Sequence, residues 1–178
     1  MNMKKYFEQG MMNLLEKKNI DSITVVEIID EVGSCKGTFY KHYIDKYYLC
    51  CNCLEHNVYG AVSVQASSWK EFIMQCLGAF EKHAKVVLHA FDSKDVNSAR
   101  RQHEKLTFEF LAKKYVANGG DPSSAINMIT LKLYSEAVTE IIYKWLEGGC
   151  RESGEELYGL ICAVIPQTVF KELREQIA

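Results

Sequence analysis

The sequence predicts an all-α protein of about nine helices: a small N-terminal three-helix domain followed by a larger C-terminal helical bundle. Apolar residues recur at helical spacing, as in Phe7, Met11, Leu14 and Leu15. Serine or threonine precedes glutamate by three residues at several points, which is the capping-box pattern of a helix start. The chain has no convincing strand run of alternating apolar residues.

The first three helices are expected within the first 43 residues. Residues 3–18 read as one helix, and residues 19–22 form the loop that follows it. Thr24 and Glu27 make a capping box, so a second helix starts there. Gly33 should end this helix, because glycine accepts the left-handed conformation in which many helices finish.

A third helix is expected from about Lys36 to Tyr43, with Phe39 facing inward. Its other face carries side chains suited to phosphates and base edges, namely Lys36, Thr38, Tyr40, Lys41 and His42. Three lysines stand against one aspartate from Lys36 to Lys46, although the formal net charge of the whole chain is −2. The pattern fits a helix-turn-helix, and its ordinary alternative is a solvated lysine face.

The stretch GSCKGTFYKHYIDKYYL resembles the end of the DNA-binding domain of the TetR family. The similarity covers roughly residues 4–50 and is specific in Ile23-Thr24-Val25, Ile28, Gly33, Gly37-Thr38-Phe39-Tyr40, His42 and Asp45-Lys46. Three residues depart from the family pattern. Cys35 replaces the serine that usually caps the recognition helix, Ser34 replaces an apolar turn residue, and Tyr43 replaces a common phenylalanine.

The resemblance implies a DNA-binding transcriptional regulator that acts as a repressor. Residues 1–48 would form the helix-turn-helix domain and residues 49–178 the effector-binding and dimerisation domain. A homodimer would bind operator DNA, and an unidentified small-molecule effector would release it. The resemblance assigns phosphate contacts to Thr24, Tyr40, His42 and Lys46. On the same surface Lys36 and Thr38 are our candidates for base edges, Lys41 adds charge, and Gly37 lets the helix approach closely.

The remaining helices are expected from capping and breaking residues. Asp45 should cap a fourth helix that runs to about Val64. The later helices are expected at residues 69–82 after a Ser68/Glu71 capping box, at 84–91, at 98–117, from Asp121-Pro122 to about Glu147, and after a Ser153/Glu156 capping box, with Pro166 kinking or splitting the last.

The eighth helix is apolar over more than one stripe, so it is expected to bury two faces, one of them against a second copy of the chain. Dimerisation is therefore assigned to the eighth and ninth helices. The candidate lining of an effector pocket is aromatic and histidine-containing: Trp69, Phe72, Phe80, His83, His89, Phe110, Tyr134 and Trp145. The ordinary reading of each aromatic is a core residue.

Other classes of function remain as alternatives. Cys50, Cys51 and Cys53 with His56 could form a thiol- or metal-responsive sensor, but three ligands on one helix seldom close a metal site. We expect free thiols, no metal and no cofactor. No spacing typical of a catalytic triad or phosphate loop is present, so an enzyme is not expected. A helical protein-interaction adaptor is the remaining alternative. Without an apolar membrane span or signal peptide, the expected location is cytoplasmic.

Overall fold

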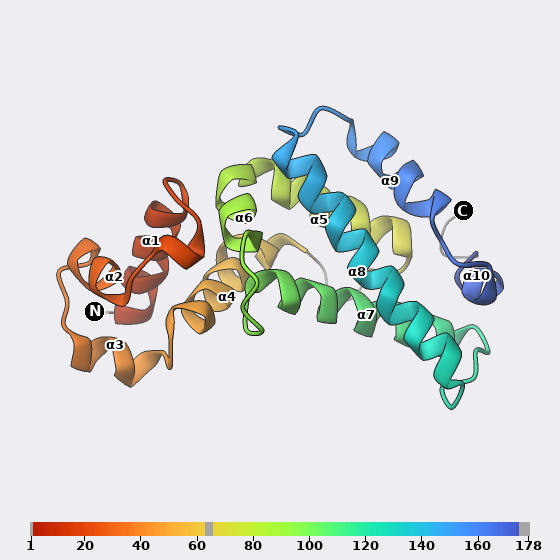
Figure 1. Cartoon of the computed structure of the whole chain (residues 1–178), viewed down its shortest axis with the longest axis horizontal. Helices are drawn as coiled ribbons and strands as arrows, with labels where there is room; N and C mark the ends of the chain where they lie inside the picture. The colour runs from red at the N-terminus through yellow and green to blue at the C-terminus, as the bar shows by residue number, and fades with distance from the viewer. Residues whose placement is uncertain (1, 63–65, 175–178) are drawn as a thin grey trace. The chain divides into compact units, whose positions relative to one another are not determined.

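The computed structural model describes residues 2–62 and 66–174, and in these ranges it is built of α-helices and short 3₁₀ turns without any strand (Figure 1). The helices are α1 (Met3–Leu15), α2 (Val25–Glu31), α3 (Lys36–His42), α4 (Lys46–Asn57), α5 (Trp69–Lys82), α6 (Ala84–Phe91), α7 (Ala99–Ala117), α8 (Ala125–Glu147), α9 (Gly154–Ala163) and α10 (Gln167–Arg174). The 3₁₀ turns are η1 (Ile20–Ser22) and η2 (Tyr59–Ala61). The predicted all-α class is confirmed. None of the described helices has the length and apolar character needed to cross a membrane.

The fourth helix is shorter than the sequence predicted. It ends at Asn57, and its expected end at Val64 lies outside the described residues. The side-chain amide of Asn57 donates a hydrogen bond to the Cys53 carbonyl at 2.9 Å. Side-chain bonds of this kind compete with the backbone hydrogen bonds that would continue the helix. The β-branched Val58 and then Gly60 follow, and both are poor helix formers.

The eighth helix starts later than predicted, at Ala125 rather than at Asp121-Pro122. The Asp121 carboxylate accepts hydrogen bonds from the backbone N–H and the hydroxyl of Ser123, at 2.9 and 2.8 Å. Asp121 therefore closes a turn of its own, and Ser124 becomes the N-cap. Near the C-terminus, Pro166 separates α9 from α10, so the described residues form ten α-helices where about nine were predicted for the chain.

Packing divides the chain into two compact units. Unit 1 contains Met1–Gly60 and His83–Gln102, and unit 2 contains Ala61–Lys82 and His103–Ala178. Unit 1 therefore holds the first four helices together with α6. The functional boundary expected between residues 48 and 49 stays a prediction.

Within unit 1, α1 packs against α2, α4 and α6. The fully buried Phe7 ring meets Phe39 of α3 edge-on, with ring centroids 5.6 Å apart. Gly10 is needed for the approach of α1 to α2, because a Cβ at this position would lie 2.6 Å from Cγ1 of Val32. The three-helix core therefore fixes which side of α3 faces inward.

The turn between α2 and α3 has the predicted chemistry. Thr24 and Glu27 form both hydrogen bonds of the capping box at the start of α2. Gly33 adopts φ +62°, in the left-handed region. The Ser34 N–H donates to the Ile29 carbonyl at 3.0 Å and the Gly33 N–H to Asp30 at 3.2 Å, the Schellman pattern that ends a helix.

Within unit 2, α8 packs against α9 and α10, and α5 packs against α9. The Tyr134 hydroxyl donates to the Ile161 carbonyl at 2.9 Å, which ties α8 to α9. The Trp145 indole N–H donates to the Glu152 carbonyl at 2.9 Å and holds the connection between these two helices. Ser153 makes the capping box that starts α9, as predicted.

Candidate nucleic-acid interface

Helix α3 has one buried and one exposed face. Phe39 is fully buried, and Tyr43, directly after the helix, is only 3% exposed. The side chains predicted to contact DNA lie on the other face, where Lys36, Gly37, Tyr40 and Lys41 are exposed and Thr38 and His42 are half-buried. Hydrogen-bond donors and positive charge are therefore available to a ligand on this side of unit 1.

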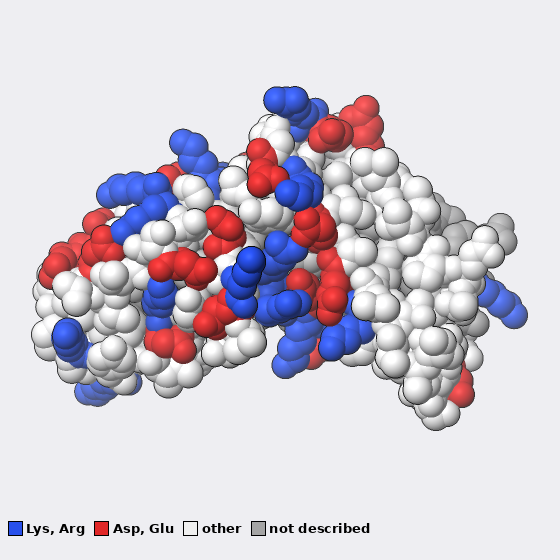
Figure 2. Space-filling view, viewed as in Figure 1, with Lys and Arg blue, Asp and Glu red and all other residues white. Residues whose placement is uncertain are grey.

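Basic side chains lie on this face together with a glycine, which leaves the helix backbone uncovered. Figure 2 shows lysine side chains separated by uncharged residues at the end of unit 1 where α3 lies. A Cβ added at Gly37 would meet no atom within 4 Å. Glycine is thus not required there by internal packing. What it provides is a flat stretch of helix that a ligand backbone can approach.

The Tyr40 ring is held in place although it is 58% exposed. It packs edge-on against the buried Phe39 ring, with centroids 5.2 Å apart at an interplanar angle of 90°. Its phenol is therefore presented to solvent by a ring whose orientation is restricted. Such a group can donate to a phosphate oxygen with little loss of side-chain entropy.

Cys35 occupies the N-cap of α3 and makes no side-chain capping bond. Its Sγ lies 3.3 Å from the Thr38 hydroxyl. The hydrogen bond from Thr38 lowers the pKa of the exposed Cys35 thiol below its ordinary value, and backbone N–H groups of the first turn add to this effect. The serine that caps this helix in the family pattern is thus replaced by a cysteine whose thiol is more acidic than an ordinary cysteine thiol.

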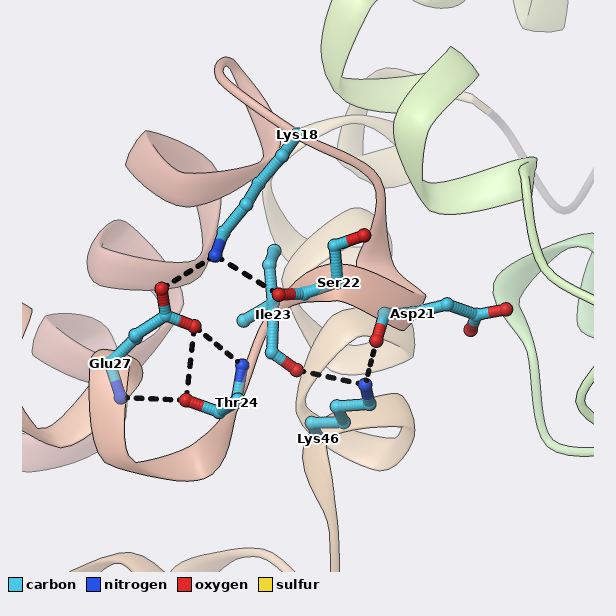
Figure 3. A network of polar contacts seen from close by, with 7 residues as sticks. All are labelled: Lys18, Asp21, Ser22, Ile23, Thr24, Glu27 and Lys46. Atoms are coloured by element: carbon cyan, nitrogen blue, oxygen red, sulfur yellow. Dashed lines mark hydrogen bonds and ion pairs between the residues drawn. The ribbon is translucent and has the colours of Figure 1, made fainter.

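The hydroxyl of Thr24, a predicted phosphate contact, is engaged inside the protein (Figure 3). It donates to the Glu27 carboxylate at 3.0 Å and accepts from the Glu27 N–H at 3.2 Å. Lys18 pairs with the same carboxylate, and its hydrogen bond is the main reason that the pKa of Glu27 falls to about 2. Thr24 is exposed, but its hydroxyl proton is already directed at an internal acceptor.

The ammonium of Lys46, another predicted phosphate contact, is also engaged. Its Nζ donates to the carbonyl of Asp21 at 2.9 Å and to that of Ile23 at 2.8 Å (Figure 3). These partners were not predictable from spacing, because Lys46 begins α4 whereas the carbonyls belong to the segment that leads into α2. Sequence reasoning also missed Lys18, for the same reason.

The eight pocket candidates are divided between the two units, six in unit 2 and two in unit 1. Four aromatic rings of unit 2 meet: Trp69 lies 5.8 Å from Phe72, 6.0 Å from Phe110 and 6.1 Å from Tyr134 between ring centroids. Phe80 instead packs against His103, and Trp145 holds the start of α9.

The remaining two candidates, His83 and His89, belong to unit 1. The Nδ1 of His89 lies 2.5 Å from the Leu15 carbonyl, so this ring ties α6 to the end of α1. His89 is thus a structural residue of the unit that contains the helix-turn-helix.

The thiols of α4 are poorly suited to redox or metal chemistry. Cys50 and Cys53 are buried, and burial raises the pKa of both, that of Cys53 to about 12. Cys51 follows the same trend, with burial raising its pKa to about 11. His56 turns to the Glu8 carboxylate at 3.0 Å. Within residues 2–62 and 66–174, no group of three or more His, Cys, Asp or Glu residues could hold a metal ion.

Comparisons with known proteins address the family and the fold. A TetR-type family model described as "Transcriptional regulator C-terminal region" matches residues 67–167, which is more than half of the chain. No curated protein sequence matches the chain. Its structure is similar to a solved one named "Dihydroxyacetone kinase operon activator DhaS", with a TM-score of 0.61 and 14% sequence identity over 98% of each chain. At this identity the likeness concerns the fold alone.

Proposed function

The chain belongs to the TetR family of transcriptional regulators, and on that premise we propose that it binds operator DNA as a homodimer and represses transcription until a small molecule releases it. The exposed polar face of α3 is the observation that carries this proposal. Lys36 and Lys41 supply charge there, and Gly37 leaves the helix surface open. In this reading α3 enters the major groove, where Lys36 and Thr38 face base edges.

The phosphate contacts are assigned to side chains that are available to a ligand. Tyr40 and Lys41 are exposed, and His42 lies half-buried at the end of the same helix. Each phosphate neutralised by a lysine releases a counterion, so affinity for a duplex falls steeply with salt. The family resemblance also places Thr24 and Lys46 at phosphates, but their polar groups have the internal partners described above.

The homodimer is supported by an apolar surface on unit 2. Five large side chains of α8, α9 and the residue that follows α9 are at least half exposed in the single chain: Ile126 (66%), Ile129 (55%), Leu133 (59%), Leu160 (53%) and Val164 (50%). An apolar face of this kind is typical of what a two-fold dimer buries. Pairing would present two copies of α3 to successive major grooves, roughly 34–36 Å apart along the duplex.

A small-molecule site in unit 2 is supported by polar groups near its aromatic cluster. In the described part of the chain, the buried Thr107 hydroxyl has no hydrogen-bond partner, and the buried Trp69 indole N–H faces the Tyr134 hydroxyl without meeting full hydrogen-bond geometry. Leaving such a group unsatisfied costs about 1–3 kcal/mol. A ligand with an acceptor near Trp69 and Phe110 would recover part of that cost. A thermal-shift screen comparing wild type with Trp69→Phe and Thr107→Val tests this, and stabilising compounds should lose effect in the variants.

Repression is proposed because a dimer that covers two grooves over a promoter excludes polymerase without further contacts, whereas activation needs an additional surface. A reporter with the bound duplex placed across its promoter tests the sign. Repression predicts lower output when the chain is expressed, and increased output would reverse the assignment.

The DNA-binding claim is tested by repeated selection from a random duplex pool, followed by fluorescence anisotropy with the tightest duplex recovered. We expect retention at low salt, loss at high salt, and a complex of two chains per duplex by light scattering. A helical adaptor that binds only protein would show no enrichment of any duplex, and that result would reject the proposal.

A further inference from the structure

The segment that leads into α2 is held by two lysines from different parts of unit 1. Three successive carbonyls, those of Asp21, Ser22 and Ile23, each accept a hydrogen bond from a lysine ammonium (Figure 3). Lys46 of α4 takes the first and third, at 2.9 and 2.8 Å, and Lys18 takes the second at 3.0 Å. We call this arrangement the lysine clasp.

We propose that Lys46 is a positioning residue that holds the start of α2 through the lysine clasp, and not a phosphate contact. The inference rests on the proposed DNA-binding function. Two of the three N–H donors of Lys46 are used at short distances by carbonyls that precede the α2 N-cap. Moving the ammonium away from this segment to reach a phosphate would break two charge-assisted hydrogen bonds, which are stronger than neutral ones.

The position of Lys46 on its own helix supports the same role. It is the first residue of α4, after the N-cap Asp45. A cation is unfavourable at the positive end of a helix dipole. The two carbonyls of the lysine clasp offset this cost, since each presents the negative end of a peptide dipole to the ammonium. Lys46 is also only half-buried, so it bridges the two segments at the surface.

A second set of contacts fixes the same segment. The Tyr47 hydroxyl donates to the Asp21 carboxylate at 3.0 Å, and the Ser93 hydroxyl donates to the same oxygen at 2.7 Å. Neighbouring residues of α4 thus hold Asp21 by its carbonyl and by its carboxylate. Asn19 adds a hydrogen bond to Asp92 at 2.8 Å. The segment from Asn19 to Ile23 is therefore fixed on both sides.

The lysine clasp bears on recognition because it sets where α2 begins. Ile23 and Thr24 are held extended, with φ/ψ of −85°/134° and −105°/154°, immediately before the capping box. In a helix-turn-helix the first helix crosses the DNA backbone while the second enters the groove. A start of α2 that moves freely would therefore cost binding affinity without removing any phosphate contact.

The test compares Lys46→Met with Lys41→Met, which removes the same charge from the exposed face of α3. Affinity for the selected duplex is measured across a salt series, at a temperature where melting curves show every variant fully folded. We expect Lys46→Met to lower affinity at every salt concentration with an unchanged log–log slope. Lys41→Met should reduce that slope by about one. A residue that only stabilised the fold would leave the affinity of folded protein unchanged, and Lys46→Arg should restore binding.

Hydrogen exchange without DNA separates this inference from the proposed function. Amides from residues 20 to 28 should exchange roughly tenfold faster in Lys46→Met, because the two hydrogen bonds that Lys46 donates in the lysine clasp are lost. Peptides from α8 should be unchanged, and Lys41→Met should match wild type throughout. If the wild-type protein binds no duplex, the proposed function fails. The hydrogen-exchange result then tests by itself whether Lys46 holds the start of α2. Unchanged exchange, or a slope reduced as in Lys41→Met, overturns the positioning role.

Discussion

At the scale of single residues, a substitution at Gly37 should affect folding stability and DNA binding in opposite directions. A side chain at this position would touch nothing inside the protein. Gly37→Ala should stabilise the fold by up to about 1 kcal/mol, because alanine is the better helix former. It should nevertheless weaken duplex binding, because its methyl group stands on the face assigned to DNA. Melting curves and anisotropy titrations measure the two effects.

Gly78→Ala is the matched control for this prediction. Gly78 lies exposed in α5, and a Cβ there also meets no atom within 4 Å. This variant should gain stability in the same way and keep full affinity for DNA. Equal binding by the two alanine variants would remove Gly37 from the interface.

Cys35 gives a second test at the residue scale. It is exposed and its pKa is lowered, whereas burial raises the pKa of Cys50, Cys53 and Cys76. Iodoacetamide should therefore modify Cys35 first, as mass spectrometry of peptides would report. The added group stands at the start of α3 and should block duplex binding by its bulk. Protein alkylated at Cys35 that still bound normally would place the thiol away from DNA.

Cys35→Ser is the control for the reagent. Serine is the better N-cap, so this variant should be as stable as wild type or more stable, by about 1 kcal/mol. It should bind the selected duplex, and brief iodoacetamide treatment should leave that binding unchanged.

At the scale of elements, helix starts marked by a capping box were predicted correctly, whereas the start of α8 and the end of α4 were not. The capping pairs Thr24/Glu27 and Ser153/Glu156 act within one turn, so their spacing alone predicts α2 and α9. The end of α4 depends on the side chain of Asn57. Competing local bonds of this kind are available in many sequence contexts, so spacing does not identify which one forms.

The candidate interface was likewise predictable where it depends on local spacing and not where it depends on contacts between distant residues. The exposed face of α3 follows from helical periodicity around Phe39, so its composition was visible in the sequence. The partners of Lys46 were not visible, because its contacts with Asp21 and Ile23 join residues more than twenty positions apart. The close approach allowed by Gly10 is non-local as well.

The apolar stripe of α8 yields a prediction at the element scale. Leu133→Glu should convert a dimer to a monomer, since burying an unpaired carboxylate costs several kcal/mol. We expect dimer affinity to fall by at least about a hundredfold. Analytical ultracentrifugation measures this, and Lys132→Glu places the same side chain one residue away, outside the stripe. Identical behaviour of the two variants would show that α8 does not pair through this surface.

At the scale of the whole molecule, acid stability should depend on one buried histidine. Burial lowers the pKa of His103 from 6.5 to about 4. Between these values the unfolded chain binds a proton that the folded chain does not, so the free energy of unfolding falls as pH falls from about 6.5 to 4. The loss should approach about 3 kcal/mol. Urea titrations at successive pH values measure it.

His103→Gln isolates this effect, because the glutamine side chain does not bind or release a proton between pH 6.5 and 4. The variant should show a flatter dependence on pH between 6.5 and 4.5. Below about pH 4.5 both proteins should lose stability together, because carboxylates whose pKa is lowered by folding, among them Glu27, then bind protons in the unfolded chain but stay ionised in the folded chain down to about pH 2. A wild-type curve that is flat from pH 6.5 to 4.5 would show that His103 is not held neutral by folding.

The central claim is that α3 binds duplex DNA through its exposed lysines. The most direct measurement is the salt dependence of affinity for the selected duplex, comparing Lys36→Met/Lys41→Met with Lys85→Met/Lys113→Met, which removes two exposed lysines elsewhere. The α3 pair should reduce the log–log slope by about one per chain through Lys41 and should also lower affinity through the lost base contact of Lys36, whereas the control pair should leave both unchanged. Equal slopes for both pairs and wild type would contradict the assignment of α3 as the DNA-binding helix.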